Sequence, residues 1–326
     1  KIDHRVGFSE FVGVGEEVAQ RTNGGVNDRS VVAVNGDLFY QSLEPGIRSL
    51  ATAIRYYQQW ANTPVSANVE RMVAFNDRAL LRFASGSEFS NRLVQTALPR
   101  TTSRGVVHDA SVVLDFQPIS NFRKQSAPVW EGSWEGIPVM QYFTGDFGGR
   151  ERMFAVVHSD TDNSLQLWEI TSAQQFDFNS TGEARVTWGV EFPAYTCGQP
   201  DLLKVLETTK FWFDRIFGIV DVKVEFRPDG DPCWHLWHQF RLCQARNSLE
   251  AGIVTYPVRE FCEGDNVPVA MPKPPEFECQ SGKNRPINTG YQFQLRLTIK
   301  GFCRIRRVRM YCLPKDEAPF YGMLKC

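Results

Sequence analysis

Short segments in which apolar and polar residues alternate, separated by turn residues, recur along the chain. The clearest is VVAVNGDLFYQS (31–42), in which two strand-like segments flank Asn35-Gly36. Both central residues of a type I′ turn require φ > 0, which Asn and Gly tolerate best, and this turn matches the twist of paired strands. The pattern therefore predicts a β-hairpin with Asn35-Gly36 at its corner.

The same pattern predicts hairpins or strands at four more places: 151–170, 184–192, 222–243 and 291–312. Their turns are expected at the polar segment SDTDNS, at Asp229-Gly230 and at Lys300-Gly301. We expect a mostly β fold, a β-propeller-like array of antiparallel hairpins, with β-sandwich or barrel domains as the alternative. A blade of about 40–45 residues would give roughly seven blades.

Helices are predicted only as short insertions between strands. IRSLATAIRYYQQW (47–60) places apolar residues on one helical face. SANVERMVAF (66–75) follows Pro64 and begins with Ser66, a residue that often caps a helix. SNRLVQTAL (90–98) is expected to form one or two helical turns.

No clear domain boundary interrupts the chain. The segment 264–290 carries five prolines and is expected to be a long irregular loop. The strands after it are too few to fold alone, so we interpret it as a connection within one architecture. The predicted organisation is a single β-propeller-like domain over 1–326.

Composition agrees with a folded, strand-rich protein that has large contact surfaces. Hydrophobic residues make up 42% and charged residues 22%, which argues against intrinsic disorder. Aromatic residues make up 13%, an abundance that suits strands and interfaces more than helical bundles. The net charge of −1 argues against a general nucleic-acid binder but allows a local basic segment. We expect neither a membrane-spanning segment nor a signal peptide.

All eight cysteines lie at or after Cys197, and no Cys-x-x-Cys pair occurs among them. The chain is far longer than a disulfide-stapled small domain. We expect thiols that stay free or oxidise late, in a protein made in a reducing cytoplasm.

The segment CWHLWHQFRLC (233–243) contains four residues of the types that bind zinc. In a regular strand His235 and His238 point to opposite faces, and the cysteine and histidine spacing is not that of a zinc finger. We therefore expect no metal and no cofactor.

The segment WEGSWEG (130–136) places Glu131 and Glu135 four residues apart, each directly after a tryptophan, Trp130 or Trp134. Two carboxylates can act as the acid and base of a glycosidase, and tryptophans stack on sugar rings. The two glycines favour a structural turn. The catalytic interpretation remains a minor alternative.

The densest basic segment is RIRRVR (304–309), which follows Lys300. On a regular strand, Arg304 and Arg306 share one face while Arg307 and Arg309 share the other. One interpretation is an exposed edge strand that its charges keep from aggregating. The other is contact with an acidic protein partner or with passing nucleic acid. Our candidate contact residues are Lys300, Arg304, Arg306, Arg307 and Arg309.

Five sequence segments resemble those of a known family: VVAVNGDLFYQSLEPGIRSL, NTPVS, SEFSNRLVQTALPR, APVWEGSWEGIPVMQYFTGDFGGRERMFAV and FWFDRIFGIVDVKVEFRPDGDPCW. The chain resembles tail-associated structural proteins of bacteriophages, a family that includes β-propeller-bearing proteins of the tail nozzle or head-to-tail region. The similarity runs from about residue 21 to residue 312.

The resemblance implies a virion structural protein that is not an enzyme. It implies a ring of identical copies around the DNA exit channel, made in the bacterial host cytoplasm and incorporated into the virion tail. Its partners would be other copies of itself and other tail or adaptor proteins, with passing contact to double-stranded DNA. Two other functions stay open: a propeller that binds or cleaves a host glycan through the Trp130–Trp134 segment, and an interaction scaffold of a cellular protein.

Overall fold

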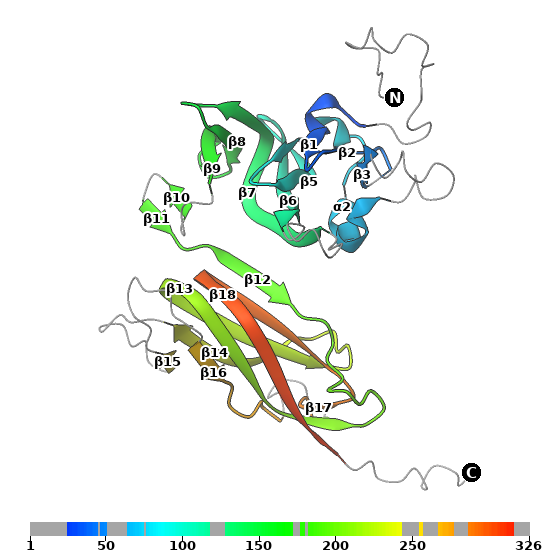
Figure 1. The fold of residues 1–326 in the computed structure, drawn as a ribbon, viewed down its shortest axis with the longest axis vertical. Coiled ribbons are helices and arrows are strands. Elements are labelled where there is room, and N and C mark those ends of the chain that lie inside the picture. Colours follow the sequence, from blue (N-terminus) through cyan, green and yellow to red (C-terminus); the bar gives the residue numbers. More distant parts are fainter. Residues whose placement is uncertain are drawn as a thin grey trace, which may run out of the picture. The chain divides into compact units, whose positions relative to one another are not determined.

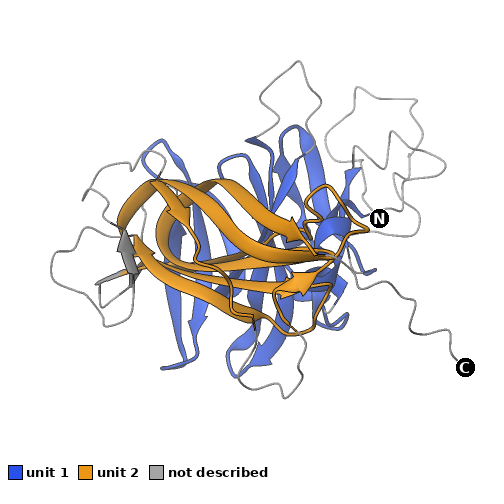
Figure 2. Cartoon of the chain, turned by 90° about the horizontal axis from the view of Figure 1, so that it is seen from below, with its two compact units in different colours: residues 1–171 blue, residues 172–326 orange. Residues whose placement is uncertain are grey.

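The structure is a computed structural model. It describes residues 25–44, 46–50, 64–74, 76–117, 128–171, 177–179, 182–242, 254–256, 267–276 and 286–315. These residues belong to two compact units, 1–171 and 172–326, which are coloured separately in Figure 2. Both units consist mostly of antiparallel β-sheet (Figure 1). This confirms the mostly β class, while the propeller arrangement and the single domain over 1–326 stay predictions.

Unit 1 holds a three-stranded sheet, a six-stranded sheet and short helical segments. The helical segments are η2 (Asp28–Ser30), η3 (Val65–Val69), α2 (Glu70–Ala74) and η4 (Leu81–Phe83). The strands are β1 (Val32–Val34), β2 (Asp37–Gln41), β3 (Ile47–Ser49), β4 (Gly86–Glu88), β5 (Arg92–Thr102), β6 (Gly105–Asp115), β7 (Val129–Asp146), β8 (Glu151–Ser159) and β9 (Ser164–Ile170). The sheets follow chain order, β1-β2-β3 and β4-β5-β6-β7-β8-β9.

The first predicted hairpin is confirmed. β1 and β2 pair with Val34 opposite Asp37, and Asn35 and Gly36 have φ values of 51° and 74°. The predicted 151–170 hairpin is also confirmed as β8 and β9, joined by a turn in which Asn163 has a φ of 54°. In both places the turn residues adopt the left-handed backbone that their side chains tolerate.

Of the three helices predicted in unit 1, one is confirmed and two are wrong in their described residues. The helix predicted over 66–75 is confirmed by η3 and α2, but Ser66 is not its cap: Pro64 precedes the first helical residue, and the Ser66 hydroxyl accepts a hydrogen bond from the Ile47 N–H at 3.0 Å. The helix predicted over 47–60 is wrong at its start, because Ile47–Ser49 forms β3; residues 51–63 lie outside the described residues.

The helix predicted over 90–98 is wrong, because this segment forms a tight turn followed by β5. Ser90 and Asn91 have positive φ values, and Phe89 and Arg92 exchange two backbone hydrogen bonds of 2.9 Å across the turn. The start of β5 is buried on both faces. A strand that is buried on both faces has a continuous apolar sequence, and the periodicity of such a sequence does not distinguish it from a buried helix.

The six-stranded sheet has a hydrophobic cluster on each face. One cluster combines Leu93, Val112 and Leu114 with residues of the three-stranded sheet. The other combines Val94 and Val113 with residues of β7 and β8. Adjacent residues of β5 and β6 therefore serve different clusters, as the alternation of side chains along a strand requires.

The side chain of Ser85, which directly precedes β4, links this end of the six-stranded sheet to β7. The buried Ser85 hydroxyl accepts a hydrogen bond from the backbone N–H of Tyr142 at 2.9 Å and lies 3.3 Å from the Tyr142 carbonyl oxygen. The Ser85 main chain pairs with Thr96 on β5. Ser85 thus connects β5 with the second half of β7, so the sheet curls on itself.

Unit 2 contains one curled seven-stranded sheet and a separate hairpin of β10 (Asp177–Asn179) and β11 (Gly182–Ala184). The strands of the large sheet are β12 (Thr187–Glu191), β13 (Lys204–Pro228), β14 (His235–Leu242), β15 (Val254–Tyr256), β16 (Val267–Ala270), β17 (Thr289–Gly290) and β18 (Phe293–Pro314). β13 and β18 are the longest, and they pair along nearly their whole lengths. The predicted 222–243 hairpin is confirmed by the pairing of β13 with β14.

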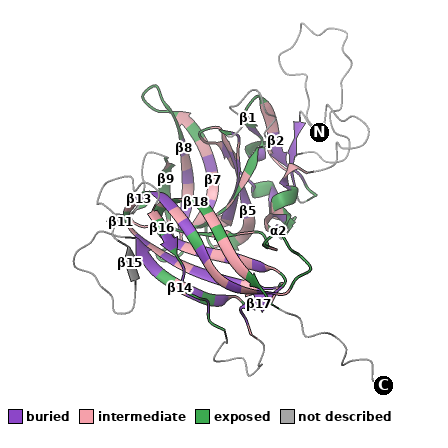
Figure 3. Cartoon of the chain, turned by 60° about the horizontal axis from the view of Figure 1, so that its bottom comes forward, coloured by how far each residue is buried: buried purple, intermediate pink, exposed green. Residues whose placement is uncertain are grey.

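The curl of this sheet follows from a bend in β13. Arg215 and Gly218 have positive φ values, and the register with β18 shifts on both sides of Phe217. Residues from both halves of β13, including Phe211 and Phe226, join a single core cluster with β14, β16 and β18. Figure 3 shows buried positions along β13 and β14. Burial of one concave face is what holds the bent strands in this shape.

The turn predicted at Lys300-Gly301 is wrong, because β18 continues through it. Gly301 has a φ of 122°, and a Cβ at this position would lie 2.6 Å from the Ile219 carbonyl oxygen. The glycine therefore permits close contact between β18 and the bend of β13. Close approach of another backbone is a common reason for a glycine inside a strand.

The loop predicted over 264–290 is wrong at 267–270 and 289–290, which form β16 and β17, whereas the other described residues, 271–276 and 286–288, belong to no helix or strand. β16 pairs with Lys210–Phe213, and β17 pairs with Lys204 and Val205. Both strands belong to the same sheet as β13, which agrees with a connection inside one architecture. In the part of the chain that the structure describes, no helix is both long and apolar enough to cross a membrane.

Candidate interaction surface on strands β13 and β18

The basic segment lies on an exposed strand edge of unit 2. β12 pairs with β18 from Arg296 to Lys300. Beyond Lys300, the pairings of the described residues place β13 along one edge of β18 and no strand along the other. Arg304, Arg306, Arg307 and Arg309 are all exposed. This agrees with the edge strand that the charges predict.

The expectation that the arginines divide between two faces is wrong, because β18 has a bulge at Arg306. Phe213 pairs with Ile305, whereas the next residue of β13, Trp212, pairs with Arg307. The extra residue reverses the alternation. The residues packed on the core change accordingly from Cys303 and Ile305 to Val308, Met310 and Cys312.

The bulge therefore gathers the basic side chains on the outer face. We call this face the basic strip and define it by four cross-strand pairs and the bulge residue: Thr208–Tyr311, Lys210–Arg309, Trp212–Arg307, Asp214–Arg304 and Arg306. It holds five cationic side chains and one carboxylate. Positive charge at this density favours contact with anions.

Asp214 is the carboxylate of the basic strip. Arg304 donates to it through Nε at 2.7 Å and through Nη2 at 2.5 Å, and Nη1 of Arg306 lies 3.3 Å from the same carboxylate. These hydrogen bonds, chiefly from Arg304, hold the pKa of Asp214 below its ordinary value. Asp214 therefore stays ionised at neutral pH and orients the two guanidinium groups.

Aromatic rings support the other cations of the basic strip. The Arg307 guanidinium lies 5.1 Å from the centre of the Trp212 ring. Lys210 and Arg309 lie 5.6 Å and 5.5 Å from the Tyr311 ring. A ring face attracts a cation without neutralising it. These side chains are thus positioned while their charge stays available to a partner.

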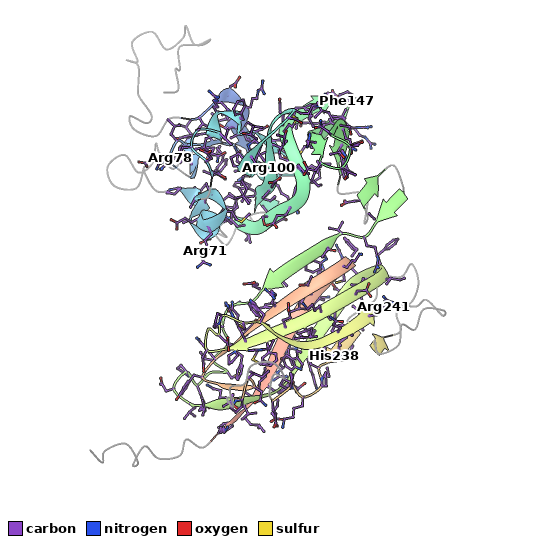
Figure 4. All side chains as sticks on the ribbon, turned by 180° about the vertical axis from the view of Figure 1, so that it is seen from behind. Arg71, Arg78, Arg100, Phe147, His238 and Arg241 are labelled. Carbon is purple, nitrogen blue, oxygen red and sulfur yellow. The ribbon has the colours of Figure 1, made fainter. Side chains whose placement is uncertain are left out.

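Lys300 lies outside the basic strip, opposite Asp221 of β13. Asp221 accepts hydrogen bonds from Arg185 at 2.8 Å and from Arg241 at 2.5 Å, and Figure 4 labels Arg241 on β14. These contacts lower the pKa of Asp221, although burial acts in the opposite direction as the largest single influence. The structure thus separates Lys300 from the four arginines and places it opposite a carboxylate that already pairs with two other arginines.

Sequence reasoning missed the residues of β13 that complete the basic strip, namely Lys210, Trp212 and Asp214. Their partners on β18 are 90 or more residues away. Alternation marks them as outward-facing, but only the strand register shows which arginine each one meets.

The expectation that His235 and His238 point to opposite faces is wrong, again because of a bulge. Val224 pairs with His238, while Glu225 pairs with Leu236 and Phe226 with His235. Both histidines therefore lie opposite core residues. Among the described residues, no group of three or more His, Cys, Asp or Glu side chains is placed to hold a metal ion. Cys243 lies outside the described residues.

The turn expected over 130–136 is wrong, because this segment forms the start of β7. Gly132 and Gly136 have φ values of 109° and 88° within the strand. Glu131 forms an ion pair with Arg92 at 2.8 Å, and Glu135 accepts a hydrogen bond from Ser133. Each carboxylate thus has a nearby structural partner.

Trp130 and Trp134 pack on opposite faces of the six-stranded sheet. Trp130 pairs with Leu114 and contacts the cluster that includes Leu114. Trp134 contacts the other cluster, and its ring lies edge-on to Phe89. The two rings do not form a common platform on which a sugar chain could stack.

Unit 1 also presents an apolar patch on β7, β8 and β9. Phe154 stacks on Phe143 with ring centres 5.5 Å apart and meets Phe147 edge-on at 5.0 Å. Figure 4 labels Phe147, which is half exposed. Leu165 and Leu167 of β9 are 50% and 64% exposed. Exposed apolar side chains grouped in this way mark contact surfaces.

A scan of the chain against protein-family models finds no match, and neither does a search of curated proteins.

Proposed function

We propose that the chain is a virion structural protein, a subunit of a phage tail or connector assembly that surrounds the DNA exit channel. The observation that carries the proposal is the basic strip on β13 and β18. Its five cations on one exposed face have the chemistry that attracts a phosphate backbone or an acidic neighbour. The phage-tail identity rests on the resemblance, which covers about residues 21–312.

The composition of the basic strip suits passing contact with DNA. The cations are positioned by aromatic rings and by one carboxylate along the edge of a sheet. A phosphate backbone that moves past would meet oriented charges without a groove that reads bases. Binding of this type depends on charge, is independent of sequence and weakens as salt rises.

The apolar patch of unit 1 supports the assembly part of the proposal. Subunits of a stable ring bury large surfaces with an apolar, aromatic centre. The patch formed by Phe143, Phe147, Phe154, Leu165 and Leu167 has this chemistry. In this proposal the chain has no catalytic role, acts in the virion tail and is made in the host cytoplasm.

The first experiment is the native mass of the purified chain, measured by light scattering over a concentration series. Closed assembly into a ring of identical copies is the expected result. A variant with Leu167→Asp and Phe147→Ser should remain monomeric under the same conditions. A wild-type monomer at every concentration would contradict self-assembly of the isolated chain.

The second experiment tests the basic strip itself. Fluorescence anisotropy of a labelled DNA duplex at low salt should show binding that the substitution of Arg304, Arg306, Arg307 and Arg309 by Ser weakens at least tenfold. The salt slope should fall by about 0.9 for each phosphate that the variant no longer neutralises. The matched control replaces four exposed arginines of unit 1: Arg71, Arg78, Arg104 and Arg150.

The control variant should retain wild-type binding, because its charges do not lie on the basic strip. Equal losses in the two variants would show that total charge alone determines binding. The same four Arg→Ser substitutions can also be introduced into a phage that carries this gene. Unchanged particle yield and infectivity would overturn a role of the basic strip in assembly or ejection. We propose no glycan-binding function, since Trp130 and Trp134 lie on opposite faces of their sheet.

A further inference from the structure

Two cysteines that are far apart in the sequence meet at one end of the large sheet of unit 2. The Sγ atoms of Cys197 and Cys312 lie 3.0 Å apart, across a separation of 115 residues. Both are free thiols. Cys197 is exposed, whereas Cys312 is half-buried, packs on the core and pairs with Leu206.

The backbone at Cys197 has an uncommon conformation for this residue type. Cys197 and Gly198 have φ values of 51° and 78°, and the Gln199 N–H donates to the Thr196 carbonyl oxygen at 3.1 Å. Asn, Asp and Gly are the usual residues at such a turn position. Here a thiol occupies it and approaches a second thiol.

Hydrogen bonds hold both sides of the cysteine pair in place. Tyr195 and Phe293 exchange backbone hydrogen bonds of 2.8 Å and 3.0 Å just before Cys197. The Lys315 N–H donates to the Leu203 carbonyl oxygen at 2.8 Å just after Cys312. The sulfur atoms need to approach by only about 1 Å to reach a covalent S–S distance.

We propose that Cys197 and Cys312 form a disulfide when the chain meets a low-molecular-weight disulfide such as oxidised glutathione. The exposed Cys197 thiolate attacks one glutathione sulfur, which forms a mixed disulfide and releases one glutathione thiolate. Cys312 then loses its proton to solvent, attacks Cys197 Sγ and displaces the second glutathione thiolate. The two protein thiols are oxidised, and one glutathione disulfide is reduced to two glutathione molecules. This inference is independent of the proposed function.

The disulfide would close a loop that contains β13, β14, β15, β16, β17 and most of β18. It would join the turn before β13 to the end of β18, one residue after Tyr311 of the basic strip. Closing a loop of this length restricts the unfolded chain strongly, and we expect the melting temperature to rise by roughly 5–15 °C.

The test is peptide mapping of the full chain after incubation with oxidised glutathione, alkylation of remaining thiols and digestion with trypsin. Cleavage after Arg and Lys places Cys197 in peptide 186–204 and Cys312 in peptide 310–315, each with a single cysteine. The expected product is a crosslinked pair of these peptides, about 2 Da lighter than their sum. Burial raises the pKa of both Cys303 and Cys312, and Cys312 is the one placed 3.0 Å from Cys197. Peptide 301–304 therefore serves as an internal control and should be recovered without a crosslink.

Two variants make the result specific. Cys197→Ser should abolish the crosslink and the rise in melting temperature, and its position in an exposed turn allows the chain to fold. Cys233→Ser, an exposed cysteine on another loop, should change neither. Recovery of 186–204 and 310–315 as separate alkylated or glutathionylated peptides from the wild-type chain would overturn the proposal. Crosslinking of Cys197 to a different cysteine would overturn it equally.

Discussion

Arg304 donates two hydrogen bonds to the carboxylate of Asp214, its direct cross-strand neighbour, at 2.7 Å and 2.5 Å. The side chain of Asp214 is 6% exposed, whereas that of Arg304 is 48% exposed. The carboxylate is thus sheltered by the guanidinium that it orients. This pair determines how much of the positive charge of the basic strip is neutralised.

Replacement of Asp214 by Asn should destabilise the fold and strengthen anion binding. The amide retains the shape of the carboxylate but loses its charge, so the free energy of unfolding at pH 7 should fall by about 1 kcal/mol. DNA binding at low salt should tighten, because the basic strip gains one unit of net charge. Denaturant titration and anisotropy measure the two effects, with the exposed Asp146→Asn as the control.

The effect of Asp214→Asn should depend on pH in one direction. The pKa of Asp214 is lowered by its arginine partners, so its stabilisation is present above the unfolded pKa of about 3.9 and is lost as pH falls through the folded pKa. The stability difference between the two proteins should therefore shrink in acid. A difference that stays constant from pH 7 to pH 3 would contradict the ion pair.

Replacement of Gly301 by Ala should lower the free energy of unfolding by about 2–4 kcal/mol, because the new Cβ meets backbone and the φ is unfavourable. The added atom would lie 2.6 Å from the Ile219 carbonyl oxygen. Gly36→Ala is the matched control: it also has a positive φ, but nothing lies within 4 Å, so its cost should be about 1 kcal/mol. Equal costs would show that conformational strain alone, without close packing, explains Gly301.

His108 should make unit 1 less stable in mild acid. It is 1% exposed, and burial lowers its pKa to about 4. The unfolded chain, with a pKa near 6.5, binds the proton more readily, so stability falls as pH decreases from about 7 to 5 by about 2 kcal/mol. His108→Gln should remove this part of the pH dependence. A variant that keeps the full wild-type slope between pH 7 and pH 5 would assign the slope to other groups.

Replacement of Ser85 by Ala should weaken the link between β5 and β7. The change leaves the buried Tyr142 N–H without the Ser85 hydroxyl at 2.9 Å, and an unsatisfied buried donor costs about 1–3 kcal/mol. Ser133→Ala removes a hydroxyl from an exposed position of β7 and should have little effect. Hydrogen exchange should show faster exchange at Tyr142 in the Ser85 variant alone. Unchanged protection of that amide would contradict the link.

Local chemistry predicted the elements whose geometry depends on adjacent residues. Asn35-Gly36 and Asp229-Gly230 adopt positive φ values as expected, since a two-residue turn needs only the backbone freedom of those residues. The prediction failed at 90–98, where burial on both faces removed the alternation. It failed at Gly301, where a glycine that resembles a turn signal serves a close contact. In both cases the competing signal came from a neighbouring strand.

The candidate site was predicted as a segment but not as a surface. The sequence by itself determined that the chain is strand-rich and that Arg304, Arg306, Arg307 and Arg309 form its densest basic segment, because both are properties of neighbouring residues. Only the tertiary structure decided that these arginines share one face with Trp212 and Asp214, and that Cys197 meets Cys312. The physical reason is register: the bulge at Arg306 and the pairing of β13 with β18 are set by burial of the core face, which involves residues about 100 positions apart.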